Sequence, residues 1–200
     1  MNIYDRRKGE KIMEKKIKIH ITSMQSELGE TFLSQLFEES DEEFAHSAEA
    51  VKEQIESDDI RAEIEGAKME SSTEGTLVIE GGRATVRYDE TELTGMEGAT
   101  TQVSFDLDAP GLVTMLRGGG VTTSLVFEQD KRHVSIYETP FMPFEICILT
   151  MKVENRLIEE GTLKLDYVVE VKGAQAERTR FTMEISEASS LINPIKEYEE

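Results

Sequence analysis

Apolar residues recur at every second position in many short segments of this chain, a pattern typical of half-buried β-strands. In the first such segment, Lys16–Thr22, the side chains of Ile17, Ile19 and Ile21 share one face. Further segments of this kind lie at 76–80, 83–90, 101–107, 112–117, 121–127, 133–137, 144–151, 162–171 and 178–185. Because parallel strands need long crossover connections, this close spacing predicts an antiparallel sandwich or up-and-down barrel.

Turn residues separate most of these segments. Gly81 and Gly82 join two of them and readily supply the positive φ angles of a tight hairpin. The run Asp108–Gly111 predicts a second turn, and Gly118–Gly120 permits a third reversal. Because Gly118–Gly120 leads into another strand rather than a helix, it indicates a turn and not a phosphate-binding loop.

The period changes to a helical one between Glu27 and Glu65. Leu28, Phe32 and Leu36 recur at helical spacing, and Ser40 or Asp41 can cap a second amphipathic helix. The span holds 14 acidic and 2 basic residues. We therefore expect a short acidic helical insertion after the first strand. It could cover one barrel end, dock on a basic partner, or be a solvated insertion, and the cover is favoured because the apolar stripes need a surface to bury against.

The 200 residues fit one domain, with boundaries expected at 13–187 and a loose or helical tail at 188–200. Lys8-Gly9-Glu10 can be encoded by a purine-rich ribosome-binding sequence just ahead of Met13. Residues 1–12 are therefore interpreted as leader or disordered, with translation starting at Met13. An intact mass that includes Met1 would refute that interpretation.

Composition narrows the class of protein. The formal charge of −19 disfavours nucleic acid, which is bound through Lys and Arg contacts to phosphates. The lone Cys147 suits a reducing compartment, and neither a signal peptide nor a membrane span is recognisable. These features predict a cytoplasmic protein with no membrane partner. The sequence does not indicate its oligomeric state.

An ordered series of short motifs resembles the YwiB-like family of uncharacterised bacterial proteins. The motifs are Glu74-Gly75, Tyr88-Asp89-Glu90, 92–98, Arg117-Gly118, 125–128, 137–140, Thr150 and 163–167. The resemblance implies a calycin- or lipocalin-like antiparallel β-barrel of about eight to ten strands, the size of the small ligand-holding barrels. It implies no activity, because fold alone does not give function.

No catalytic chemistry follows from the motifs. Nucleophile elbows and phosphate loops ending in Gly-Lys-Ser or Gly-Lys-Thr are absent from the sequence. His20 falls on the polar face of its strand, which favours a solvated or hydrogen-bonded histidine over a metal ligand. Glu63, Glu65 and Lys68 resemble the opening strand of triphosphate tunnel enzymes, but Lys68 falls on the opposite strand face from the two carboxylates. We expect no cofactor, no metal and no enzymatic activity.

The remaining functional idea is a pocket at one barrel mouth, where a few polar groups orient a small ligand. The polar candidates at strand ends are Arg117, Tyr137 and Thr139, with Tyr88 and Glu90 as weaker ones. The alternative is that Arg117 and Tyr137 only tie down the barrel rim through hydrogen bonds to neighbouring carbonyls or carboxylates. We therefore carry two hypotheses: a non-enzymatic binding module for a small, partly apolar molecule, or an interaction protein that docks a basic partner through the acidic span.

Overall fold

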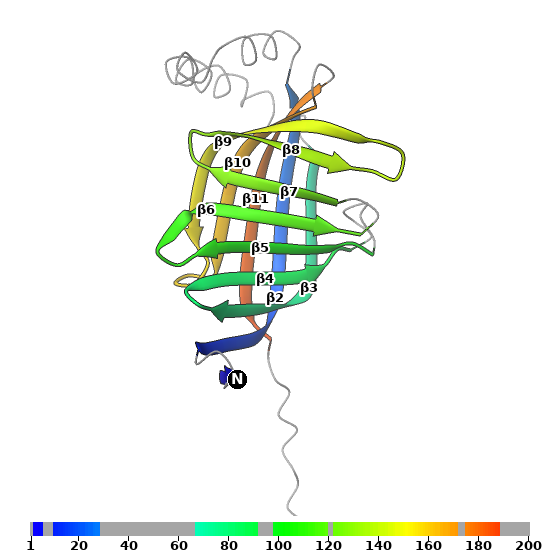
Figure 1. Cartoon of the computed structure of the whole chain (residues 1–200). Coiled ribbons are helices and arrows are strands. Elements are labelled where there is room, and N and C mark those ends of the chain that lie inside the picture. The colour runs from blue at the N-terminus through cyan, green and yellow to red at the C-terminus, as the bar shows by residue number, and fades with distance from the viewer. Residues whose placement is uncertain are drawn as a thin grey trace, which may run out of the picture.

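The computed structural model describes residues 2–5, 10–28, 67–91, 98–119, 122–171 and 175–188. Within them the chain forms β-strands and no helix (Figure 1). The strands are β1 (Asn2–Asp5), β2 (Glu10–Leu28), β3 (Ala67–Glu80), β4 (Arg83–Asp89), β5 (Thr100–Asp106), β6 (Ala109–Gly118), β7 (Thr122–Glu128), β8 (Arg132–Glu138), β9 (Pro143–Arg156), β10 (Thr162–Val171) and β11 (Gln175–Glu187).

These strands form one antiparallel sheet that closes on itself. The order runs β1-β2-β11-β10-β9-β8-β7-β6-β5-β4-β3, and β2 also pairs with β3. Strands β2 to β11 therefore make a closed ten-stranded barrel, and β1 pairs with the start of β2 alone. Long strands β2, β9, β10 and β11 form one side, and shorter strands β4 to β7 cross them steeply on the other (Figure 1). The predicted antiparallel β-barrel is confirmed.

The first strand is longer than its alternation indicates. It runs to Leu28, and Glu27 and Leu28 pair with Glu177 and Ala176 of β11. The predicted start of the helical insertion at Glu27 is therefore wrong, because pairing with β11 holds Glu27 and Leu28 in an extended strand. The interior positions there are Ser23 and Gln25, so the apolar alternation fades although the strand continues. Residues 29–66, where the rest of the acidic insertion was predicted, lie outside the described residues.

The predicted turns are confirmed in part. Gly81 and Gly82 connect β3 to β4 with φ angles of 56° and 79°. The turn expected at Asp108–Gly111 instead falls at Leu107 and Asp108, and β6 begins at Ala109. Pro110 is tolerated at the start of β6 because the pairing of β6 with β7 begins at Leu112, so the missing N–H costs no hydrogen bond there.

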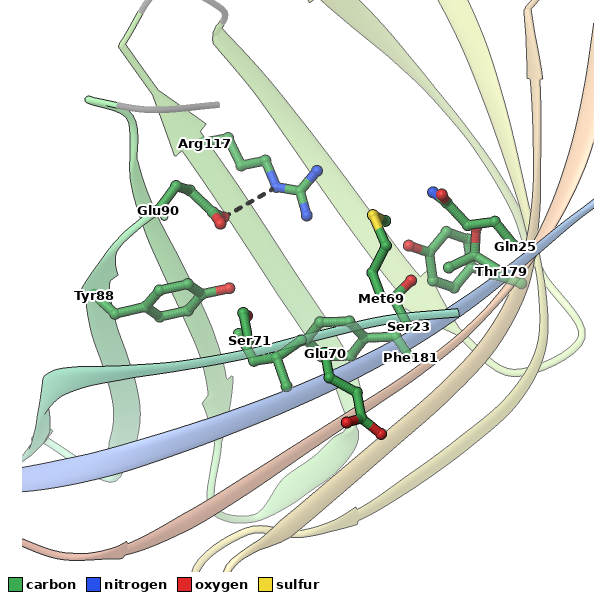
Figure 2. A pocket seen from close by; sticks show the side chains of 12 residues that line it. Ser23, Gln25, Met69, Glu70, Ser71, Tyr88, Glu90, Arg117, Thr179 and Phe181 are labelled. Atoms are coloured by element: carbon green, nitrogen blue, oxygen red, sulfur yellow. Dashed lines mark ion pairs between the residues drawn. The ribbon is translucent and has the colours of Figure 1, made fainter. Parts of the chain in front are cut away.

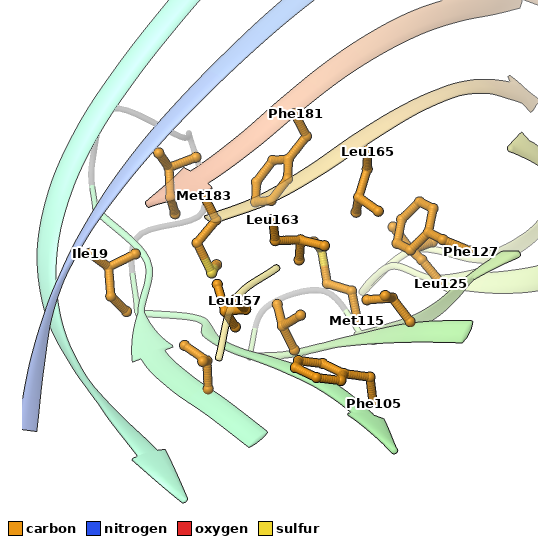
Figure 3. Close-up of a cluster of buried hydrophobic side chains, with 14 of the residues drawn as sticks. Ile19, Phe105, Met115, Leu125, Phe127, Leu157, Leu163, Leu165, Phe181 and Met183 are labelled. Carbon is orange, nitrogen blue, oxygen red and sulfur yellow. The ribbon is translucent and has the colours of Figure 1, made fainter. Parts of the chain in front are cut away.

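The barrel interior toward the β9–β10 turn is filled with apolar side chains (Figure 3). Leu157 lies in that turn and is almost fully buried, together with Leu163 of β10 and Met183 of β11. Each such side chain stabilises the fold by roughly 1.5–3 kcal/mol through removal of apolar surface from water. Other members of this apolar cluster are Ile17, Ile19, Leu77, Val86, Val103, Phe105, Val113 and Met115.

Two backbone contacts lie near the predicted domain boundaries at residues 13 and 187. The pairing of β1 with β2 joins Asn2 to Met13 and Asp5 to Glu10, and whether translation starts at Met13 stays a prediction. After β11, the N–H of Ala188 donates to the carbonyl of Lys16 at 3.3 Å. In the portion of the chain that the structure describes, no helix has the length and apolar character needed to cross a membrane.

Candidate ligand-binding site

The strand register aligns polar residues in one row across five strands. Tyr88 of β4 lies opposite Thr101 of β5, Thr101 opposite Arg117 of β6, Arg117 opposite Thr123 of β7, and Thr123 opposite Tyr137 of β8. Because side chains alternate along a strand, all five share the interior face with the apolar cluster. Three residues that the sequence predicted, Tyr88, Arg117 and Tyr137, therefore share one interior row.

A carboxylate and a guanidinium meet at this row. Glu90 follows β4, and its backbone N–H donates to the carbonyl of Ala99 at 2.8 Å, which fixes its position beside β5. Its side chain is 3% exposed, and Oε1 accepts a hydrogen bond from the Thr101 hydroxyl. Arg117 Nε lies 3.8 Å from the same oxygen, close enough for an ion pair but too far for a hydrogen bond.

In the described part of the chain, the ion pair of Glu90 and Arg117 leaves one buried hydrogen-bond donor without an acceptor. Arg117 Nε is buried yet donates no hydrogen bond within the described ranges. A buried donor without an acceptor costs about 1–3 kcal/mol. Figure 2 shows that the terminal nitrogens of Arg117 turn away from Glu90, toward the space beside Met69. The guanidinium therefore presents donors to the barrel interior.

That space is a partly enclosed cavity of about 110 Å³ (Figure 2). Its apolar wall comes from Ile21, Met69 and Phe181, and its polar wall includes Tyr88, Glu90, Arg117, Tyr167, Thr179, Ser23, Gln25 and Ser71. Glu70 also borders it, but its carboxylate points away in Figure 2 and pairs with Lys68. The volume suits several water molecules or a small organic molecule.

Two tyrosines flank the guanidinium. Burial raises the pKa of Tyr88, with a further upward push from the Glu90 carboxylate, while the Arg117 charge opposes that rise. Burial also raises the pKa of Tyr167, again opposed by Arg117. Both phenols therefore remain protonated at neutral pH. The Arg117 charge reaches both hydroxyls, so these three polar groups act on one shared region of the cavity.

A second carboxylate lies further toward the same barrel end. Burial raises the pKa of Glu177, the neighbouring Glu27 raises it further, and the Thr179 hydroxyl opposes the rise. Glu27 and Glu177 are directly opposite each other in the β2–β11 pair. Like charges at opposed positions repel, so this end of the barrel holds a carboxylate that favours its protonated form more than a free glutamate does.

The other two predicted site residues lie away from the cavity. Tyr137 belongs to the row but its ring packs on Phe144, with centroids 5.0 Å apart. Thr139 orders the turn between β8 and β9: its hydroxyl accepts from the N–H groups of Phe141 and Met142 and donates to the Met142 carbonyl. The structure thus brings Tyr88, Glu90 and Arg117 together and gives Thr139 a local turn contact.

Sequence reasoning missed most of the remaining cavity wall. Ser23, Gln25, Met69 and Ser71 line the cavity because β2 and β3 both continue past their apolar segments. Ile17, Ile19 and Ile21 are two residues apart and share one face of the strand. If the strand is continued, Ser23 and Gln25 fall on that same face, and this was the available signal. The sequence around Thr101 did not indicate that its hydroxyl donates to Glu90.

Other reactive side chains have local roles. The His20 ring lies 3.0 Å from the Ser72 hydroxyl, so the predicted hydrogen-bonded histidine is confirmed. Cys147 is half-buried, and burial raises the pKa of its thiol, which lowers its reactivity. No cluster of three or more potential metal ligands occurs among the described residues.

Comparisons place the chain among known proteins. The family described as "Domain of unknown function (DUF1934)" matches residues 53–183. The crystal structure of the YwiB protein from Bacillus subtilis superposes with a TM-score of 0.56 at 16% identity, covering 86% of this chain and 93% of that one. At that identity the likeness shows the fold. No curated protein sequence matches this chain.

Proposed function

The chain belongs to the DUF1934 family and is similar in fold to the YwiB protein, as its ordered motifs predicted, and from this premise we propose that it is a non-enzymatic binding module. Its ligand is a small, partly apolar molecule taken into the cavity beside Arg117. The calycin- or lipocalin-like character expected from the sequence belongs to the same proposal, because such barrels hold one small ligand in the mouth.

One observation carries the proposal. The barrel interior is apolar and filled near the β9–β10 turn, whereas the other part encloses a cavity walled by apolar side chains and a few oriented polar groups. Small-molecule sites combine these two features: apolar contact supplies affinity, and a few fixed polar groups supply orientation. A purely structural role for Glu90 and Arg117 would require neither the cavity nor a guanidinium turned into it.

Native mass spectrometry tests the proposal. The protein is purified gently from its source cells, its mass is measured under native conditions, and bound molecules are then released by denaturation. We expect a reproducible small-molecule adduct. A wild-type protein that repeatedly carries only its own mass, and that takes up nothing when returned to a small-molecule extract of the same cells, would overturn the proposal.

A matched pair of variants locates the adduct. Ser71 lines the cavity, so Ser71→Leu should fill part of it and reduce the adduct. Glu74 is exposed on the outer face of the same strand, so Glu74→Leu should leave the adduct unchanged. An adduct that survives Ser71→Leu would place the ligand elsewhere.

Docking on a basic partner through the acidic span is not developed further. The span lies almost entirely outside the described residues, and no contact in the described part of the chain favours it. Cytoplasmic location likewise stays a prediction.

A further inference from the structure

The polar groups around the cavity restrict the chemistry of its ligand. The guanidinium of Arg117 and the hydroxyl of Tyr88 border the same space, as Figure 2 shows, and Tyr167 also lines it. The Tyr88 hydroxyl is hydrogen-bonded to Thr101 and the Tyr167 hydroxyl to Thr179, so the guanidinium is the principal donor turned toward a ligand. Ser71 adds a hydroxyl that can donate as well, whereas the Thr179 hydroxyl already donates to Glu177 Oε1 at 3.4 Å. A charged donor turned into the cavity favours a ligand that supplies acceptors.

The acceptors already present leave little room for a cation. Glu90 is the buried carboxylate of the described cavity wall, and its Oε1 already takes the Thr101 hydroxyl and faces Arg117 Nε. Glu70 is half-exposed and pairs with Lys68. A ligand ammonium group would therefore compete with Arg117 for Glu90 and lie beside a like charge.

The geometry of Arg117 selects a planar two-oxygen group. Its Nε faces Glu90, and Figure 2 shows the terminal nitrogens turned away from Glu90 toward the cavity. Two parallel N–H groups match the two oxygens of a carboxylate, a pairing that is both stronger and more directional than a bond to one neutral oxygen. Glu90 holds the guanidinium from behind and so acts as a positioning residue.

The negative charge of the whole protein does not oppose this assignment. Most charged side chains of the described residues are not buried, and salt screens surface charges beyond about 10 Å. The Arg117 side chain is 21% exposed and lies inside the barrel wall, where an ionic hydrogen bond is less screened than at the surface. The local guanidinium therefore decides which charge the cavity accepts.

We propose, resting on the binding function above, that the ligand is a small monocarboxylate with an apolar body. Its carboxylate engages the terminal nitrogens of Arg117, while its apolar part contacts Met69, Ile21 and Phe181. Because Glu90 neutralises Arg117 in the empty cavity, it also weakens carboxylate binding by repulsion. Glu90 thereby sets the affinity at a level that permits release.

The test compares acids with their uncharged amides. Isothermal titration calorimetry measures binding of butanoate, hexanoate, octanoate and phenylacetate to the full chain, each beside its primary amide. We expect at least one acid to bind about tenfold or more tighter than its amide, the difference expected when a charged hydrogen bond replaces a neutral one. Arg117→Gln should remove that preference, and Arg117→Lys, which keeps the charge but loses the planar fork, should reduce it.

Glu90→Gln should change the affinity for carboxylates in the opposite direction from the Arg117 substitutions. Glutamine keeps an oxygen that accepts from Thr101 but loses the charge, so carboxylate binding should tighten roughly threefold to tenfold while amide binding stays the same. Circular dichroism and the unfolding temperature of each variant verify that the barrel is intact. If Glu90→Gln does not fold, Arg117→Lys carries the test.

The outcomes separate the two proposals. If acids and amides bind equally and Ser71→Leu blocks both, the cavity binds ligands but the carboxylate assignment is wrong. A molecule without a carboxylate released from the native protein would likewise overturn the assignment and leave the binding function standing. If no probe binds and the native protein carries no adduct, the binding function itself fails.

Discussion

The two parts of the barrel interior are lined by the same strands but differ in how closely their side chains pack. Near the β9–β10 turn, Leu157 is buried beside Leu163 and Met183, which are paired on the neighbouring strands β10 and β11. Toward the other end, the same inward positions carry Ser23, Tyr88 and Arg117, and a cavity separates them. The first part resembles an ordinary core, whose free energy comes from apolar burial. The second part buries less apolar surface and places polar groups around a cavity.

This difference teaches where substitutions should affect stability and where they should affect binding. Apolar truncation in the filled part leaves a void that the surrounding side chains cannot close. Truncation of a polar cavity-lining group removes little buried apolar surface, unless a buried charge loses its hydrogen bond. The following experiments test that division, from the largest expected effect to the smallest.

Truncation of a filled-part leucine should be the most costly change. Leu163 is fully buried, so Leu163→Ala should lower the free energy of unfolding by about 2–5 kcal/mol. Ser71→Ala, on the cavity wall, should change it by no more than about 0.5 kcal/mol. Urea denaturation measures both. Equal losses would mean that the cavity end is packed as tightly as the core.

The boundary between the two parts depends on a glycine. Gly75 lies opposite Ile17 and Tyr88, and a Cβ added there would come within 2.5 Å of Ile19 Cδ1 and 2.7 Å of the Arg87 carbonyl oxygen. Gly75→Ala should therefore destabilise the protein by about 1–3 kcal/mol, the cost of overpacking. Gly111→Ala meets open space, and its effect on the urea midpoint should be near zero. A harmless Gly75→Ala would show that β3 and β4 can separate without cost.

The buried carboxylate of the cavity needs its hydroxyl donor. Thr101→Val keeps the shape but removes the donor to Glu90, which should cost about 1–3 kcal/mol. Thr100 is the matched control, because its hydroxyl donates to Asp89 on the exposed outer face at 3.0 Å. Thr100→Val should cost clearly less by the same denaturation measurement. Similar costs would argue that water already reaches Glu90 freely.

The smallest effect concerns pH. The pKa of Glu177 is raised above its usual value of 4.5, chiefly by burial, so the folded protein holds its proton more tightly than the unfolded chain. The stability from this group is present below pH 4.5 and is lost as pH rises through the folded-state pKa. Glu177→Gln should therefore raise the unfolding temperature at neutral pH and change it little in acid.

The repulsion from Glu27 supplies a control for that measurement. In a Glu27→Gln background, the gain from Glu177→Gln at neutral pH should shrink, because one source of the raised pKa is gone. A gain of the same size at every pH would show that titration of Glu177 is not its cause.

Much of the fold was readable from alternation. All ten predicted strands are present as β2 to β11, because in each one face meets the interior and the other meets solvent. The predicted strands were too short where the interior becomes polar: Ser23, Gln25 and Ser71 face inward without an apolar signal. The turn after β5 was placed too late, because Asp108–Gly111 carries turn residues although Ala109 already pairs with Asp106.

The candidate site was predicted only in part, for a related reason. Arg117, Tyr88 and Glu90 are near strand ends, and a charged or polar group at such a position can be recognised one strand at a time. Their assembly required the register across β4, β5 and β6, which sets Tyr88, Thr101 and Arg117 opposite one another. Thr101 has an ordinary strand sequence around it, and only its burial beside Glu90 gives it a role.

The sequence by itself determined that this chain forms short antiparallel strands with one apolar face, because side-chain alternation and turn chemistry are local properties. The tertiary structure decided which strands are neighbours, that β2 pairs with β3 to close the barrel, and where the interior stays open. Whether facing side chains meet or leave a cavity depends on the summed volumes of residues from several strands. That sum is fixed by the register of the closed barrel, and no single segment contains it.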